Sequence, residues 1–202
     1  MRGLFGLLGL ILVLPAVSSG LEPGGIVGRV IAGEAQRHPV VVFVPGVPGQ
    51  EARATGERPV MDQRNRSFTP HVLPVGMGTT VEFRNSDPFK HNIFSPDGER
   101  YNLGTWEQGQ SRAYAFRRAG IYRQLCNIHP EMLAYIIVLD ARAFVLTDGE
   151  GRFELPAVPA GRHTVRVWGE KLTPAQLARG VEVTVAEGKV TAVEIDLRPL
   201  NR

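Results

Sequence analysis

Residues 120–139 read GIYRQLCNIHPEMLAYIIVL, and this stretch decides the expected fold. Its two ends, GIYRQL and LAYIIVL, are short runs rich in β-branched and aromatic residues, which are typical of β-strands. The segment between them, CNIHPEM, is therefore expected to be a short loop that joins two strands. That loop carries Cys126, the only cysteine of the chain, followed at intervals of three residues by His129 and Met132.

The rest of the chain also reads as strands separated by turns. Its 202 residues include 23 glycines and 15 prolines, and the apolar runs between them are short and rich in valine. In TTVEF, residues 79–83, Val81 and Phe83 alternate with polar neighbours, as on a strand with one buried face. The one helical signal is TPAQLAR, where Thr173 is suited to cap a helix and Pro174 to take its first position. The sequence therefore predicts an all-β protein.

The first 20 residues, MRGLFGLLGLILVLPAVSSG, have the order of a secretory signal peptide: a basic Arg2, an uncharged run and then small residues. The apolar part spans about 12 residues, fewer than the roughly 20 that cross a bilayer. We therefore expect an exported protein, periplasmic or extracellular, that keeps no stable membrane span after cleavage.

The charge pattern gives no sign of a nucleic-acid partner. The chain has 23 Lys and Arg residues against 20 Asp and Glu residues, and the basic residues are scattered along it. A mildly basic surface without a basic cluster does not predict binding to nucleic acid.

The lone cysteine has three interpretations: an inert buried thiol, an intermolecular disulfide, or a thiolate that binds a metal. The spacing C-x-x-H-x-x-M puts three potential ligands on one loop, and His91, which follows a strand and a turn 35 residues earlier, is the candidate fourth. Thiolate, thioether and two imidazoles suit copper, whereas zinc sites more often use further cysteines or a carboxylate. Met61 and Met77 remain alternatives to Met132 as the thioether ligand.

These residues resemble the cupredoxins, blue copper proteins of the amicyanin and plastocyanin type. The resemblance rests on His91-Asn92 and on G-x-Y-x-x-x-C-x-x-H-x-x-M from Gly120 to Met132, and it covers residues 60–140. It implies a Greek-key β-sandwich with one type 1 copper, whose equatorial ligands are His91, Cys126 and His129 and whose axial ligand is Met132. It also implies that the Asn92 side chain ties the two ligand loops together.

The C-terminal part carries a second resemblance. Residues 147–168, TDGEGRFELPAVPAGRHTVRVW, resemble the carboxypeptidase regulatory-like domain, a small transthyretin-like β-sandwich. Such a domain usually begins with strands like those at 24–46, so we expect 21–48 and 141–202 to form one discontinuous domain with the cupredoxin inserted at 60–140. The alternative is that 24–46 supplies the first strands of the cupredoxin itself.

The resemblance implies a carrier of single electrons between redox partner proteins, with donor and acceptor not identified by the sequence. Electrons would pass through the edge of His129, with Pro130 and Leu133 in the apolar surface around it. The alternative is a copper-binding carrier or sensor without an electron-shuttle role. We do not expect an enzyme, because multi-electron copper chemistry needs further centres, and the remaining histidines, His38, His71 and His163, are spread along the chain.

Overall fold

The computed structural model describes residues 22–33, 37–46, 58–141 and 143–198. These residues form sixteen strands and one short helix, so the all-β prediction is confirmed. The expected signal peptide, residues 1–20, lies outside the described residues. Within the described ranges, no helix is both long enough and apolar enough to cross a membrane.

One β-sandwich is built from the strands between residues 60 and 139. Its five-stranded sheet has the order β5 (Val72–Gly76), β11 (Leu133–Leu139), β10 (Gly120–Leu125), β7 (His91–Ser95) and β8 (Tyr101–Trp106). Its four-stranded sheet has the order β4 (Ser67–Thr69), β3 (Val60–Arg64), β6 (Thr80–Asn85) and β9 (Ser111–Ala115). Strands far apart in sequence lie side by side and parallel, β5 with β11 and β3 with β6, because the chain crosses between the two sheets.

The alternation of side chains along these strands builds the core between the sheets. In β6, Val81 and Phe83 are fully buried, whereas Arg84 points to solvent. They pack with Ile136 and Val138 from β11 on the opposite sheet. Each fully buried side chain of this size stabilises the fold by about 1.5–3 kcal/mol, so the two-residue period predicted for TTVEF is confirmed.

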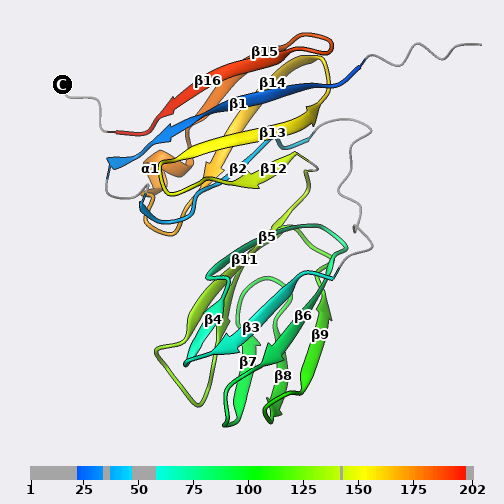
Figure 1. The fold of residues 1–202 in the computed structure, drawn as a ribbon, viewed down its shortest axis with the longest axis vertical. Helices are drawn as coiled ribbons and strands as arrows, with labels where there is room; N and C mark the ends of the chain where they lie inside the picture. Colours follow the sequence, from blue (N-terminus) through cyan, green and yellow to red (C-terminus); the bar gives the residue numbers. More distant parts are fainter. Residues whose placement is uncertain (1–21, 34–36, 47–57, 142, 199–202) are drawn as a thin grey trace, which may run out of the picture.

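The two ends of the described chain form a second sandwich (Figure 1). Its sheets have the orders β13 (Arg152–Val158), β1 (Gly24–Ile31) and β16 (Val190–Asp196), and β12 (Phe144–Leu146), β2 (Val41–Phe43), β14 (Gly161–Trp168) and β15 (Gly180–Val185). Strand β1 is antiparallel to β13 and parallel to β16, and β2 is antiparallel to β12 and β14. This pairing supports the proposal that residues 21–48 and 141–202 form one domain into which residues 60–140 are inserted.

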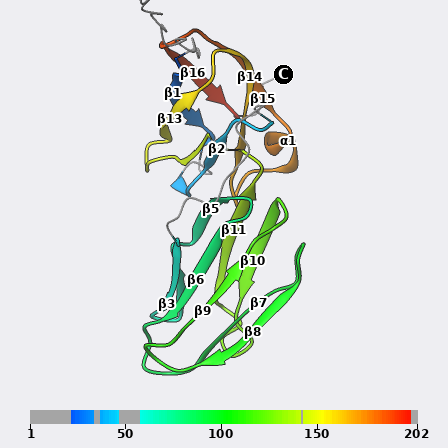
Figure 2. The same cartoon turned by 90° about the vertical axis from the view of Figure 1, so that its right-hand side faces the viewer.

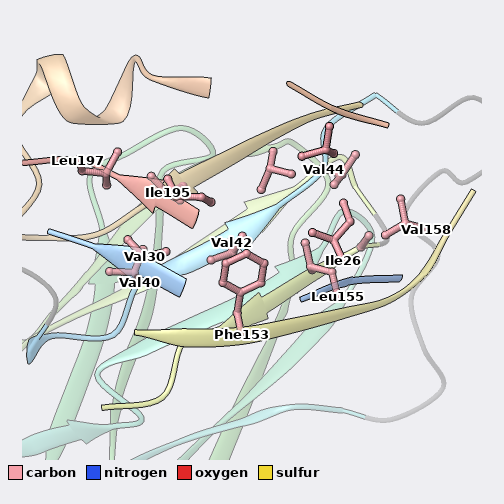
Figure 3. Packing of buried hydrophobic residues seen from close by; sticks show 14 of the residues in the cluster. Ile26, Val30, Val40, Val42, Val44, Phe153, Leu155, Val158, Ile195 and Leu197 are labelled. Carbon is pink, nitrogen blue, oxygen red and sulfur yellow. The ribbon is translucent and has the colours of Figure 1, made fainter. Parts of the chain in front are cut away.

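The core of the second sandwich consists mainly of aliphatic side chains from both of its sheets (Figure 3). Val30 from β1 and Val42 from β2 are fully buried, and both belong to the cluster that also holds Phe153, Leu155 and Ile195. The N-terminal strands therefore contribute directly to a core that the C-terminal strands could not fill alone.

The helix α1 (Pro174–Leu177) follows β14 and has the predicted start. The Gln176 backbone N–H donates to Thr173 Oγ1 at 3.3 Å, and the Thr173 N–H donates to Gln176 Oε1 at 2.8 Å. This reciprocal pair is a capping box, and Pro174 takes a first-turn position that needs no backbone donor.

A third apolar cluster joins the two sandwiches. Ile137 and Leu139 of β11 face away from the core of their own sandwich and pack with Val41 and Trp168 of the other. The Tyr135 ring lies 5.2 Å from the Trp168 ring, centre to centre. Figure 2 shows β5 and β11 next to the second sandwich. Strand β11 is thus buried on both faces, which explains its uninterrupted apolar sequence.

Gly28 tests the place of β1 between β13 and β16. A Cβ atom at this residue would lie 2.1 Å from the Val193 carbonyl oxygen and 2.9 Å from the Phe153 ring. We expect Gly28→Ala to lower the free energy of unfolding by about 1–3 kcal/mol, the usual cost of overpacking, in urea denaturation. The control is Gly149→Ala in an exposed turn, where an added Cβ meets no atom within 4 Å. Equal stability of the two variants would contradict this arrangement of β1.

Candidate metal centre

The metal-binding candidates lie at one end of the first sandwich, where β10 ends and β7 begins. His91 is the first residue of β7, and Cys126 directly follows the last residue of β10. The two strands pair antiparallel, with Leu125 opposite Phe94, so their ends at the loop are neighbours. His91 is 0% exposed and Cys126 is 4% exposed, whereas His129, in the loop that follows, is partly exposed.

Three donor atoms converge at this end. The Cys126 Sγ atom lies 3.9 Å from the Nδ1 atoms of both His91 and His129, and the two Nδ1 atoms are 3.1 Å apart. A triangle with these edges has a point about 2.1 Å from all three corners, and protein ligands such as imidazole nitrogen and thiolate bind zinc at about 2.0–2.3 Å. The three atoms therefore fit a single transition-metal ion in trigonal coordination. Among the described residues, this is the one group of three or more histidine, cysteine or acidic side chains close enough to share an ion.

The tautomer of His91 is fixed by a buried carboxylate. His91 Nε2 lies 2.8 Å from Asp87 Oδ2, and both side chains are at most 5% exposed. A ring nitrogen at this distance from a carboxylate carries the proton and donates it as a hydrogen bond. The Nδ1 lone pair of a neutral His91 ring therefore points toward Cys126, as a metal ligand requires.

Asp87 is itself held by a turn from another part of the chain. Its Oδ1 accepts a hydrogen bond from the Asn65 N–H at 2.7 Å, and its Oδ2 accepts one from the Arg66 N–H at 3.0 Å. Burial raises the pKa of this carboxyl, but its three hydrogen bonds outweigh that effect, so the pKa of Asp87 lies below its usual value. No sequence pattern pairs Asp87 with His91 or with the turn at Asn65; the one signal is an acidic residue four positions before a candidate ligand.

Asn92 links β7 to the loop that carries the cysteine. Its Nδ2 donates to Asn102 Oδ1 at 2.9 Å and to the Gly104 carbonyl oxygen at 2.8 Å, both on β8. Its Oδ1 accepts a hydrogen bond from the Asn127 N–H at 3.3 Å. The Asn92 side chain thus joins β7, which carries His91, to Asn127, the residue after Cys126.

Met132 is buried at the end of the loop that carries Cys126 and His129. Its backbone N–H donates to the His129 carbonyl oxygen at 3.0 Å, which closes the loop, and its side chain is 1% exposed. It belongs to the same core cluster as Cys126, and so does Met61, whereas Met77 packs at the edge of that cluster. The loop position favours Met132 over the other two as the thioether ligand.

Three apolar residues close to His129 in the sequence are at least partly exposed. Pro130 is exposed, Leu133 is half-buried, and Ile128 is 47% exposed. The Phe89 ring lies 5.2 Å from the His91 ring and 5.5 Å from the His129 ring, centre to centre. Ile128 had not been predicted as part of the apolar surface expected around His129, although it lies within the loop.

The other three histidines are not part of this group. His38 is exposed, His71 Nε2 lies 2.8 Å from Glu170 Oε2, and His163 Nε2 lies 2.7 Å from the Pro159 carbonyl oxygen. The contact of His71 with Glu170 joins the two sandwiches.

No protein-family model matches the chain, and no curated protein sequence matches it. Similar solved structures include a reduced mutant of amicyanin, which is 22% identical over 48% of this chain and 97% of that chain with a TM-score of 0.39. The Cu(I) form of another amicyanin mutant is 22% identical over 47% of this chain and 98% of that chain, also with a TM-score of 0.39.

A Cu-containing nitrite reductase, NirK from Thermus scotoductus SA-01, is 27% identical over 48% of this chain, with a TM-score of 0.40. The match spans only 28% of the reductase chain. The similar structures are thus cupredoxins.

Proposed function

We propose that the chain carries single electrons through one mononuclear type 1 copper held by His91, Cys126 and His129, with Met132 as the axial ligand. The observation that carries this proposal is the convergence of three donor atoms on one point, within about 4 Å of one another.

The chemistry of the donor set supports copper. A thiolate and a thioether are soft ligands, and two imidazoles with one thiolate form the trigonal plane of blue-copper electron-transfer sites. Zinc would leave the buried methionine without a role, because its sites rarely use thioethers. When bound, copper supplies reversible one-electron chemistry.

The protein's part in this function is to hold the donor atoms still. His91 is oriented by Asp87, and the loop after Cys126 is tied to β7 and β8 by Asn92. Ligands fixed from outside by hydrogen bonds change position little when the charge at the site changes. Such rigidity favours electron transfer over the copper-carrier alternative, because releasing an ion requires a fully buried His91 and a nearly buried Cys126 to open.

Electrons would enter and leave at the partly exposed His129. Its neighbours Ile128, Pro130 and Leu133 offer an apolar contact surface for redox partner proteins. A small contact area suits partners that must dissociate quickly.

We propose no catalytic activity for the chain itself and expect it to be exported. Multi-electron chemistry would need a second metal centre, and His38, His71 and His163 do not join any group of ligands in the described parts of the chain. Export rests on the signal-peptide pattern of residues 1–20.

Cys126→Ser tests the thiolate. Addition of one equivalent of Cu(II) to the mature wild-type protein should give an intense absorption band in the orange-red region and a narrow copper hyperfine splitting in EPR. Both signals arise from the copper–thiolate bond, so the serine variant should lose them while its far-UV circular dichroism stays the same. A coloured serine variant, or a colourless wild type, would refute the proposed site.

Asp87→Asn tests the support of His91. Loss of a carboxylate that orients a ligand typically costs 10–100-fold in metal affinity, and we expect the dissociation constant for Cu(I) to rise by that factor in competition with a chromophoric chelator. The matched control is Asp97→Asn, an aspartate two residues beyond the end of β7 that accepts hydrogen bonds from the backbone and side chain of Arg123 and from no candidate ligand. The proposal fails if Asp87→Asn binds as tightly as the control.

A further inference from the structure

The turn between β3 and β4 has an unusual backbone. Asn65 and Arg66 both have positive φ, 53° and 54°, which is the requirement of a type I′ hairpin turn. Asparagine adopts this conformation readily, but arginine seldom does. The two backbone N–H groups of this turn are those that bind Asp87, so the rare conformation is coupled to the orientation of His91.

The Arg66 side chain contacts Phe89, whose ring lies next to those of the two candidate histidine ligands. Its guanidinium carbon is 5.3 Å from the centre of the Phe89 ring, in a cation–π contact, and Phe89 in turn contacts the rings of His91 and His129. Arg66 is exposed, so the Phe89 ring links a solvated positive charge to the rings of the two candidate ligands. Adding the distance from the guanidinium carbon to the Phe89 ring centre and the distance from that centre to each imidazole centre gives an upper limit of about 11 Å between the charge and either imidazole. This is comparable to the Debye length of about 8 Å at physiological salt.

The Arg66 guanidinium has no ion-pair partner among the described residues. In the ranges that the structure describes, no carboxylate forms an ion pair with the Arg66 guanidinium, whereas Arg64 pairs with Asp62 at 3.3 Å and Lys90 with Glu107 at 3.0 Å. The Asp87 carboxylate also lies close to His91, but it is bound by backbone N–H groups of the turn and by His91, so removing the Arg66 guanidinium changes one charge and leaves Asp87 in place. A nearby positive charge disfavours the more highly charged state of a metal ion.

We propose that Arg66 is a positioning residue of the metal centre: its guanidinium holds Phe89 over the ligands and raises the reduction potential of the bound copper by favouring Cu(I) over Cu(II). This inference rests on the proposed function, and it adds a third segment of the chain, the β3–β4 turn outside both ligand loops, to the determinants of the potential.

The test compares reduction potentials of copper-loaded variants by spectroelectrochemistry at low ionic strength. Arg66→Asn removes the charge and keeps a residue that tolerates positive φ, so the turn and its bonds to Asp87 should persist, as checked by unchanged optical and EPR signatures. We expect its potential to be lower than that of the wild type. Arg66→Lys keeps the charge, and its potential should lie close to the wild-type value.

Arg118→Asn is the control for net charge. Arg118 lies at the opposite end of the sandwich, separated from Cys126 by strand β10, whose six residues span about 20 Å. The control should leave the potential unchanged. The difference between wild type and Arg66→Asn should shrink as salt rises to about 1 M, where the Debye length is about 3 Å.

Equal potentials for the wild type and Arg66→Asn at low salt would overturn the inference, and so would a potential of Arg66→Lys as low as that of Arg66→Asn. Both outcomes leave the proposed function intact, because they require a copper–thiolate signal in all variants. A wild type without that signal would overturn the proposed function and this inference together.

Discussion

The antiparallel pairing of β7 with β10 determines where the donor atoms can meet. His91 begins one strand and Cys126 follows the other, so two residues 35 positions apart in sequence are brought to the same edge of one sheet. His129 lies three positions after Cys126, and its Nδ1 is 3.1 Å from the Nδ1 of His91. A slip of this register by one residue would turn His91 away from the core, because successive side chains on a strand point to opposite faces.

The centre depends on more than the two ligand segments. Asp87 connects His91 to the β3–β4 turn, and Asn92 connects β7 to β8 and to the cysteine loop. The buried Asn85 holds the intervening segment, since its Nδ2 donates to the carbonyl oxygens of Phe89 and Trp106. Because Asn85, Asp87 and Asn92 are each buried and each hydrogen-bonded to defined partners, the site has little freedom to rearrange.

The sequence predicted the parts of this arrangement that repeat locally. The alternation of buried and exposed side chains predicted strands such as β6, and the capping signals at Thr173 and Pro174 predicted the start of the helix. The sequence around Cys126 predicted the loop between β10 and β11. The bond between Asp87 and the turn at Asn65 could not be predicted, because it depends on the parallel pairing of β3 with β6, which leaves no periodic signal in the sequence. The apolar run of β11 predicted burial but did not say that its second face packs on another sandwich.

The turn at Asn65 and Arg66 determines how much of the chain would have to be transferred to rebuild the metal centre in another protein. Residues 120–139 contain most of the recognisable pattern, yet the orientation of His91 depends on two amides that precede this segment by more than 50 residues. A designer who grafted only the cysteine loop and the first histidine onto another sandwich would transfer the donors without the scaffold that aims them. A faithful transplant needs the whole hairpin β3–β4 as well, so the natural unit of exchange for this centre is the sandwich and not the loop.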